Sequence, residues 1–476
     1  MSQPTLVQPK INVLDEEHIN QIHEYALTIL AQTGLKVESE KALKLLAGHS
    51  GVKVSGDRVT FEREVVEWAI QAAPSYFDVY NRLGEHVFRM GDDRTRFGIG
   101  CTTLHYQDPI SGKTVPFNRK HMVKMVRLGH VLPKYDTVAT IGILQDIPPD
   151  VADLYATLEM VANTTKPLVV LVSDENLFPA TLDMLEHLTG KLAEKPYILP
   201  YFNPITPLVI NRGTSDKMFA TIERGLPFFY NSYGLSGMTS PITPAGVLAM
   251  LVAEQLAGLT LAQVIKEGTP IVLGFLPAYI DMQSMVNFYD PTSYFLNLAG
   301  AEIMAYYDIP YSGTGGGATG WGPDFMTAAS YWMNHLPALM SKVDFVGFVG
   351  NTMTGKVFSP VNVVMGHEII TQALKFAEGC TLDDENVGLS DILEQGPGGH
   401  FLSTPLTRKH VRQAYYKSPI YPRFTFEEWS KLGQPDAVTM LKEYARDLLE
   451  TLTAPEDHKE LLEKGERFIQ TVELTV

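Results

Sequence analysis

The chain has 476 residues, of which 45% are apolar, and its formal net charge is −16. An acidic chain without a basic run argues against nucleic acid and anionic membrane surfaces as partners, and it favours small-molecule chemistry. The two cysteines, Cys101 and Cys380, cannot form a disulfide framework, and residues 1–10 hold no apolar signal core. We therefore expect a cytoplasmic protein.

Residues 1–95 are the first of three predicted regions, a helical lead-in with a hairpin. An apolar face over residues 19–30 predicts one helix, and residues 62–73 predict a second. Two short strand signals at residues 77–81 and 86–90 predict the hairpin.

The middle region, residues 96–378, alternates strand signals with helical patterns. The strand signals lie at residues 96–100, 137–141, 168–172, 198–202, 227–230, 271–274, 309–312 and 345–348. The helical patterns lie at residues 121–129, 153–163, 178–188, 215–224, 245–266, 292–307 and 324–336. Eight alternating strands predict an α/β fold, a (β/α)8 TIM barrel, although an open doubly wound sheet has the same rhythm. The longest apolar helix signal, residues 247–265, carries Glu254 and Gln255, so we expect it in a core and not in a membrane.

The last region, residues 379–476, has a different pattern. A turn-rich stretch at residues 396–401 is followed by a basic helix signal at residues 408–416 and a polar one at residues 436–452. We expect a C-terminal extension that packs on the barrel.

One stretch, residues 309–325, contains six glycines between Gly313 and Gly322, with a strand signal before them and a helix signal after them. Glycine at this density permits positive φ or a close approach to the backbone. Residues 315–320 match G-x-G-x-x-G, but the dinucleotide fingerprint belongs to the first βαβ unit, so this match is weak. A plain surface loop is the other alternative.

Aromatic rings lie beside amides at the predicted C-terminal ends of several strands. A quaternary ammonium cannot donate hydrogen bonds and is held by ring faces, at about 0.5–2 kcal/mol for each ring. We therefore predict an aromatic cage with amide anchors beside the glycine loop, and the N–H groups at the start of the helix after Gly322 suit a carboxylate. The predicted rings are Phe202, Tyr230, Phe275 and Trp321, the anchors are Asn203, Asn231 and Asn351, and the loop residues are Gly315, Gly316 and Gly317.

Metal and covalent chemistry have little support in the sequence, and no catalytic residue stands out. H-E-x-x-H, C-x-x-C, P-loop and G-x-S-x-G motifs are all absent. Cys101 and His105 have the spacing of half a zinc site, but two cysteines cannot complete a thiolate centre, so we predict no metal. The cobalamin-ligand pattern D-x-H-x-x-G is absent too, so we expect no corrinoid bound by this chain.

Residues 253–263, 310–324, 336–339 and 395–401 resemble the trimethylamine:corrinoid methyltransferase superfamily, and the resemblance extends over nearly the full chain. It implies a (β/α)8 barrel that moves a methyl group from a methylamine to the cobalt of a separate corrinoid protein.

One departure from the superfamily pattern bears on the substrate. The trimethylamine enzyme carries pyrrolysine shortly before a Pro-Asp pair, and counting back from Pro323 places that position at or beside Gly317. The chain therefore resembles the non-pyrrolysine branch, most of all glycine betaine:corrinoid methyltransferase, whose members demethylate glycine betaine, proline betaine, carnitine and butyrobetaine. The resemblance implies a quaternary amine as substrate, with glycine betaine first, and a corrinoid protein as partner. We also expect a homo-oligomer.

Two other functions stay open at this point. A barrel enzyme that grips a phosphate after its seventh strand is one, although residues 309–325 contain no Arg or Lys. A protein that binds a betaine without turnover is the other.

Overall fold

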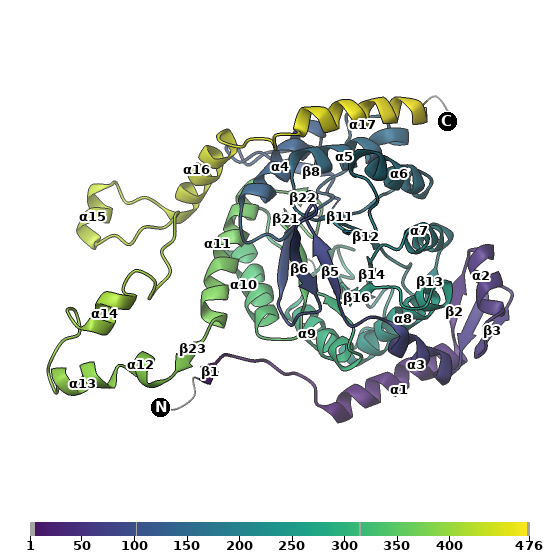
Figure 1. Ribbon diagram of the computed structural model, residues 1–476, viewed down its shortest axis with the longest axis horizontal. Coiled ribbons are helices and arrows are strands. Elements are labelled where there is room, and N and C mark those ends of the chain that lie inside the picture. Colours follow the sequence, from purple (N-terminus) through teal and green to yellow (C-terminus); the bar gives the residue numbers. More distant parts are fainter. Residues whose placement is uncertain (1–4, 101, 314–315, 474–476) are drawn as a thin grey trace.

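Eight parallel strands close into a barrel in the computed structural model, which describes residues 5–100, 102–313 and 316–473 (Figure 1). The strands are β7 (Arg96–Ile99), β10 (Thr137–Ala139), β11 (Leu168–Val170), β12 (Ile198–Phe202), β14 (Phe228–Ser232), β16 (Ile271–Phe275), β19 (Tyr311–Ser312) and β20 (Phe345–Val349). They neighbour one another in this order, and β20 pairs with β7 to close the ring. The predicted (β/α)8 barrel is confirmed, with every strand at an expected position.

Helices follow the strands and cover the outside of the barrel. They are α4 (Arg119–Val131), α5 (Pro149–Asn163), α6 (Phe178–Thr189) after the short helix η1 (Glu175–Leu177), α7 (Arg212–Glu223), α8 (Pro244–Ile265), α9 (Pro291–Tyr306), α10 (Phe325–Leu339) and α11 (Pro360–Ala377). The sequence patterns had predicted all of these α-helices except α11. Helix α8 is long and apolar enough to cross a membrane, but 83% of its most apolar window is buried inside the protein, as in a core helix.

Side chains along the barrel strands alternate between the lumen and the helix layer, because a strand has a period of two residues; β20 departs from this alternation, since its register shifts between Val346 and Val349. On β12, Leu199 and Tyr201 belong to the core inside the lumen, whereas Ile198 and Phe202 belong to the core between strands and helices. We call the first set the lumen cluster. Its barrel members are Ala139, Val169, Leu199, Tyr201, Phe229, Val272, Phe345 and Phe348.

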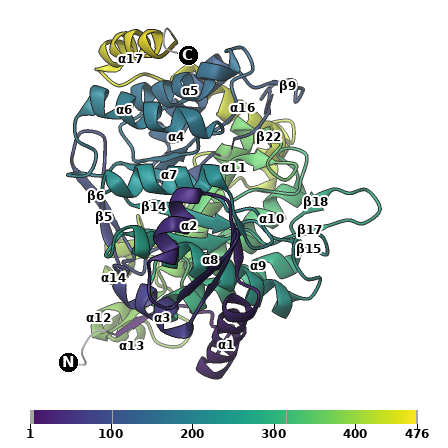
Figure 2. The same ribbon diagram turned by 90° about the vertical axis from the view of Figure 1, so that its right-hand side faces the viewer.

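The hairpin of β5 (Phe77–Tyr80) and β6 (His86–Met90) closes the end of the barrel at which the strands begin. Its side chains Phe77, Val79, Phe88 and Met90 belong to the lumen cluster. The Tyr80 amide donates to the Pro196 carbonyl, just before β12, at 3.0 Å. The predicted hairpin is therefore present, and it leaves the other end, which we call the mouth, for chemistry. Figure 2 shows β5 and β6 on one side of the molecule and the mouth loops around β17 on the other.

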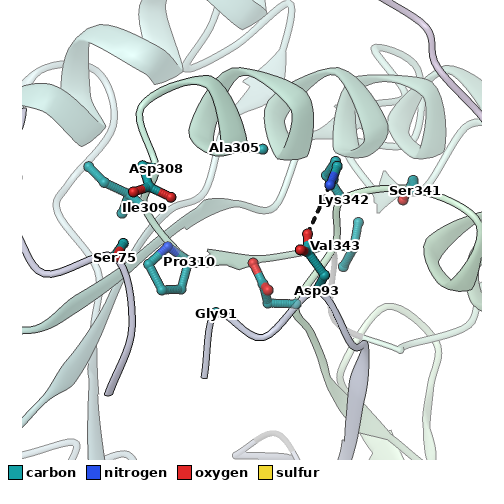
Figure 3. Close-up of a pocket in the computed structure, with 11 residues that line it drawn as sticks. Ser75, Gly91, Asp93, Ala305, Asp308, Ile309, Pro310, Ser341, Lys342 and Val343 are labelled. Atoms are coloured by element: carbon teal, nitrogen blue, oxygen red, sulfur yellow. Dashed lines mark hydrogen bonds and ion pairs between the residues drawn. The ribbon is translucent and has the colours of Figure 1, made fainter. Parts of the chain in front are cut away.

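A cavity of about 260 Å³ lies beside the hairpin, at the closed end of the barrel (Figure 3). Gly91, Asp308 and Pro310 line it, and an ion pair of 2.8 Å joins Lys342 to Asp93 at its edge. These residues precede the strands β19 and β20 or follow the hairpin. The cavity is therefore remote from the mouth, where the active sites of such barrels lie.

The N-terminal region covers α8 from outside. Helices α1 (Glu16–Gln32), α2 (Glu40–Ala47) and α3 (Arg63–Ala72) all contact α8 (Figure 2). Between them, β2 (Leu35–Val37), β3 (Val52–Ser55) and β4 (Arg58–Phe61) form a sheet with β13 (Val209–Ile210), which the sequence patterns did not predict.

Two small sheets border the mouth, since their strands lie in loops that follow barrel strands. One contains β8 (His105–Gln107), β9 (Thr114–Pro116), β21 (Asn351–Thr352) and β22 (Val357–Phe358). The other contains β15 (Leu235–Ser236), β17 (Ala278–Ile280) and β18 (Asn287–Phe288).

The C-terminal region first leaves the barrel and then returns to it. Strand β23 (Cys380–Leu382) pairs with β1 (Thr5–Val7). Residues 383–435, which we call the arm, project from the barrel (Figure 1) and contain α12 (Asp384–Val387), α13 (Leu389–Gln395), α14 (Pro405–His410) and α15 (Phe426–Lys431). Helix α16 (Ala437–Glu450) then contacts α11, and α17 (His458–Glu473) packs on α5 and α6.

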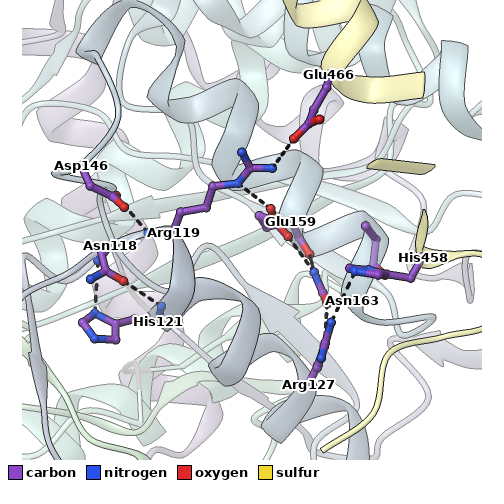
Figure 4. A network of polar contacts seen from close by, with 10 residues as sticks. Asn118, Arg119, His121, Arg127, Asp146, Glu159, Asn163, His458 and Glu466 are labelled. Carbon is purple, nitrogen blue, oxygen red and sulfur yellow. Dashed lines mark hydrogen bonds and ion pairs between the residues drawn. The ribbon is translucent and has the colours of Figure 1, made fainter. Parts of the chain in front are cut away.

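A partly buried charge network holds α17 on the barrel (Figure 4). Arg119 donates to Glu159 at 2.6 Å and to Glu466 of α17 at 2.8 Å, and the Glu159 side chain is almost fully buried. Loss of Arg119 would leave the buried Glu159 carboxylate without its counter-ion, which is strongly destabilising, whereas Arg119 is 25% exposed and also pairs with Glu466. The extension therefore packs on the barrel through α16 and α17. Within the arm, Tyr416 also donates to Glu368 of α11 at 2.7 Å and Ile420 is buried in the main core, whereas α12 to α15 project from the barrel.

Candidate active site

Two aromatic rings meet inside the barrel near its mouth. The ring centroids of Tyr201 on β12 and Phe348 on β20 lie 5.1 Å apart, with an interplanar angle of 73°. Phe348 has a φ of +67°, a left-handed conformation that is unusual for a bulky residue. Its carbonyl accepts a hydrogen bond of 2.6 Å from the Asn351 side-chain amide. Such strain is found mainly where the surrounding structure holds a functional site.

Three of the predicted cage rings face the helix layer and not the lumen. Phe202 packs against Phe178 of α6 at 5.5 Å between centroids, and Tyr230 lies over Gly258 of α8. Phe275 lies over Gly300 of α9 in the same way. All three are fully buried in the outer core. The physical reason is the strand alternation, which directs Tyr201 and Phe229 inward and their neighbours outward. We therefore leave these three rings out of the site.

Trp321, the fourth predicted ring, lies at the protein surface. Its side chain is 78% exposed, while its carbonyl accepts a hydrogen bond of 3.0 Å from Gln107. An exposed ring anchored through its backbone is better placed to contact a partner than to enclose a small cation.

The predicted amide anchors lie at strand ends around the mouth. Asn231 is fully buried, and its side-chain amide has no hydrogen-bond partner among the described residues. Asn203 donates to the Asn231 carbonyl at 2.6 Å, which joins the ends of β12 and β14. Asn351 holds Phe348 and contacts the glycine loop. A buried amide without a partner is costly, so it suits a site that a ligand fills.

The glycine loop packs tightly against the turn after β20. Gly316 donates from its amide to the Gly347 carbonyl, and Ala318 donates to the Asn351 carbonyl at 3.3 Å. Gly317 is buried, and a Cβ there would lie 2.5 Å from Oδ1 of Asn351. The close approach, and not a positive φ, explains this glycine, since its φ is outside the left-handed range. Gly315 lies outside the described residues.

The helix start after the glycine loop is already capped by the chain itself. Asp324 accepts from the amides of Thr327 and Trp321, each at 2.8 Å. Its carboxylate thus occupies the position at which we expected a substrate carboxylate. A substrate anion needs another anchor.

Glu254 and Gln255 on α8 support the mouth from the helix layer. Glu254 accepts from Thr206 at 2.8 Å and from the Leu208 amide at 2.6 Å, and burial raises the pKa of this carboxyl group. Gln255 donates to Ser232 at 2.7 Å and accepts from the Gly274 amide at 2.9 Å, so it ties β14 to β16. Residues 253–263, to which Glu254 and Gln255 belong, therefore position strand ends and loops at the mouth.

A cavity of about 360 Å³ opens at the mouth beside Tyr201. Lumen-facing residues line one side of it, and the loops after β11 and β12 line the other. Its lining includes Thr102, Leu171, Tyr201, Asn203, Asn211 and Lys217. No group of three or more His, Cys, Asp or Glu side chains in the described ranges is placed to hold a metal ion, and Cys101 lies outside those ranges.

The comparisons with known proteins agree with this architecture. The sequence profile of the trimethylamine methyltransferase family (MTTB) matches residues 1–473. The chain belongs to this family. It is thus a member of a family of corrinoid-dependent methyltransferases that act on methylated amines.

Several relatives from this family align along most of the chain. A glycine betaine methyltransferase of Desulfitobacterium hafniense is 28% identical over 430 residues, 89% of each chain. A trimethylamine methyltransferase MttB of the same species is 27% identical, over 92% of this chain and 89% of that one. A proline betaine:corrinoid methyltransferase of Eubacterium limosum is 23% identical, over 85% and 86%.

A solved structure of another methylamine enzyme has a similar fold. The monomethylamine methyltransferase MtmB of Methanosarcina barkeri superposes with a TM-score of 0.53 and 11% identity, covering 94% of this chain and 89% of that one. At this identity the likeness concerns the fold alone.

Proposed function

We propose that this family member transfers a methyl group from a quaternary amine, glycine betaine first, to the cobalt of a separate corrinoid protein. The observation that carries the proposal is the pair of lumen rings, Tyr201 and Phe348, beside a cavity and a fully buried amide at the barrel mouth. Ring faces attract a cation that has no N–H group. Family membership and the names of the relatives support the reaction class.

The site has the properties that this reaction needs. A quaternary ammonium already carries its positive charge, so when a C–N bond breaks the electron pair stays on nitrogen and a neutral tertiary amine leaves. No proton has to move, which fits a site in which no acid or base stands out. The reduced corrinoid of the partner protein would supply the nucleophile for the methyl group. The residues of this chain then have to hold the ammonium against Tyr201 and Phe348, orient one methyl group to the mouth, and exclude water.

The partner is expected to dock on the rim of the mouth. Loops that follow six barrel strands expose large apolar side chains there, and such a patch marks a protein interface. We call this set the rim patch: Leu104, Ile205, Met238, Ile242, Met282, Met285, Trp321, Phe325 and Met353.

We also propose that the chain forms homo-oligomers through the arm. The arm has little core of its own, and its exposed apolar residues include Leu389, Leu393, Leu402 and Phe426. Light scattering coupled to size exclusion measures the mass directly, and a monomer at all concentrations would contradict this proposal.

A turnover experiment tests the proposed function. The purified chain is mixed with a reduced corrinoid protein and with glycine betaine, proline betaine, carnitine, butyrobetaine or trimethylamine, and methylation of the corrinoid is followed by absorbance. We expect transfer from a quaternary amine, with glycine betaine the best donor, and not from trimethylamine. Binding of glycine betaine without any transfer would instead indicate a binding protein.

A further inference from the structure

A lysine without an ion pair lines the mouth cavity next to the lumen. Lys217 on α7 is half-buried, and its Nζ donates to the Val172 carbonyl at 3.3 Å, a long hydrogen bond. In the part of the chain that the structure describes, Lys217 forms no ion pair. Burial lowers the pKa of this ammonium group. A lysine in such a place gains most from an anion that enters the cavity.

The acidic groups that face Lys217 are largely committed to the backbone. Asp153 accepts from the amides of Ser173 and Asp174 at 2.8 and 3.0 Å. Asp174 accepts from the Asn176 amide at 2.9 Å. Glu175 is the remaining one, and it is exposed at the edge of the cavity. None of them is close enough to pair with Lys217, so the counter-ion position is open.

A second polar side chain in the same cavity has an atom without a hydrogen-bond partner. Asn211 precedes α7, and its Oδ1 is buried without a hydrogen bond among the described residues. Its side chain makes no cap hydrogen bond to the helix. Since the amide oxygen and nitrogen are interchangeable by a rotation of 180°, Asn211 can present its NH₂ group to an anion.

The cavity joins these groups to the proposed ammonium site. Tyr201 and Leu171, which face the lumen, line the same cavity as Lys217 and Asn211. The helix start after the glycine loop cannot serve as the anion site because Asp324 caps it.

We propose that Lys217, assisted by Asn211, binds the carboxylate of a zwitterionic quaternary amine whose ammonium group faces Tyr201. This inference rests on the proposed function and deepens it. It assigns the substrate class as betaines, which carry a carboxylate, and it sets them apart from quaternary amines that lack one. Lys217 is thus a specificity-determining residue.

Two ligands that differ at the carboxylate test the inference. Choline has the trimethylammonium group of glycine betaine but a hydroxyl group in place of the carboxylate. Binding of each to the full chain is measured by calorimetry for wild type, Lys217→Met, Lys217→Arg and Asn211→Leu, with thermal melting as a check of folding. Lys191→Met is the matched control, because Lys191 is exposed and lies two residues beyond the C-terminal end of α6. KM for each amine is measured with a reduced corrinoid protein.

We expect Lys217→Met to weaken glycine betaine binding by about 10- to 100-fold, as for a lost hydrogen bond to a charged group, and to leave choline binding equal or stronger. Lys217→Arg should retain most of the affinity, Asn211→Leu should lose less than Lys217→Met, and Lys191→Met should match wild type. If Lys217→Met does not fold, the inference is tested with Lys217→Arg and Asn211→Leu, by the ratio of the affinity for glycine betaine to the affinity for choline.

The outcomes separate the two proposals. If wild type demethylates glycine betaine and Lys217→Met does so with unchanged KM, the proposed function stands and this inference is wrong. Equal losses for glycine betaine and choline would also overturn it, because they indicate a general loss of the cavity. If wild type neither binds nor demethylates any quaternary amine, the proposed function fails and the inference fails with it.

Discussion

The ring of Tyr201 on β12 meets the ring of Phe348 on β20 across the barrel lumen, edge to face at 5.1 Å. The two residues are almost 150 positions apart in the sequence, and the closure of the barrel brings them together. The hairpin of β5 and β6 closes the end of the lumen at which the strands begin, so a ligand reaches the two rings from the mouth. This pair is the centre of the proposed site.

Removal of one ring should weaken substrate binding. We expect Tyr201→Leu to raise KM for glycine betaine by about 2- to 30-fold, which corresponds to a cation–π loss of about 0.5–2 kcal/mol. Tyr201→Phe keeps the ring face and should stay near wild type. Steady-state kinetics with a reduced corrinoid protein measures KM.

A ring on the adjacent strand β14 supplies the control for this variant. Phe228→Leu shortens a buried ring of similar size, but that ring belongs to the core between strands and helices and not to the lumen cluster. It should lower the melting temperature like Tyr201→Leu and leave KM unchanged. If the two variants have the same KM, the Tyr201 ring does not contact the substrate.

The sequence predicted the barrel well because its signals are local. Each strand is a short buried run such as Phe228–Ser232, and each helix has its own apolar pattern. Eight such strands that alternate with helices are enough to predict the barrel. The sheet of β2, β3 and β4 was missed, because strands of three or four residues carry little periodicity.

The site was harder to predict because it depends on register. An error of one residue exchanges Tyr201 for Phe202, and the inward side chain becomes an outward one. Alternation counted forward from Leu199 separates the two residues, but it can be used only once Leu199 is known to face the lumen. Lys217 escaped notice for a different reason: it lies on a helix, and the fold alone brings it to the cavity of Tyr201.

The exposed aromatic residues of the rim patch should bind the partner protein. Trp321 and Phe325 are 78% and 80% exposed, and interface anchors of this kind are often worth about 2 kcal/mol or more. We expect the double variant Trp321→Ser, Phe325→Ser to lower the affinity for the corrinoid protein at least tenfold, with glycine betaine binding and melting unchanged. Leu402→Ser, an equally exposed residue on the arm, is the control and should not affect this affinity. Wild-type affinity in the double variant would place the docking surface elsewhere.

A buried histidine should make the fold sensitive to acid. His335 on α10 is fully buried against Tyr331 and Phe97, its ring nitrogens have no partner among the described residues, and burial lowers its pKa to about 3. The unfolded chain binds this proton near pH 6.5, so the contribution to stability is complete above pH 6.5. It falls by about 1.4 kcal/mol for each pH unit below that value, until the pH approaches the folded pKa.

The substitution His335→Phe should remove this pH dependence. We expect the free energy of unfolding, measured by urea titration at pH 7.5, 6 and 5, to decrease less on acidification in His335→Phe than in wild type. His400→Phe, at an exposed position on the arm, should keep the wild-type slope. Equal slopes in wild type and His335→Phe would show that another group controls the acid response.

Gly317 should be required for activity because of its contact with Asn351. A side chain at this position would push the Asn351 amide away, and that amide holds the carbonyl of Phe348 in its strained conformation. The ring pair at the site would then shift, and a displacement of about 1 Å can cost about 10²-fold in rate. We expect Gly317→Leu to lose glycine betaine demethylation steeply with a much smaller fall in melting temperature, since the loop lies at the mouth and outside the lumen cluster.

A double-variant cycle separates this effect from a general loss of folding. Gly317→Ala alone should reduce kcat/KM, because its Cβ meets Oδ1 of Asn351. In an Asn351→Ala background the same change meets no side chain there, so its additional effect should be small. If Gly317→Ala costs the same activity in both backgrounds and lowers melting in parallel, Gly317 is a structural turn residue. Full activity in Gly317→Leu would mean that the glycine loop does not border the substrate.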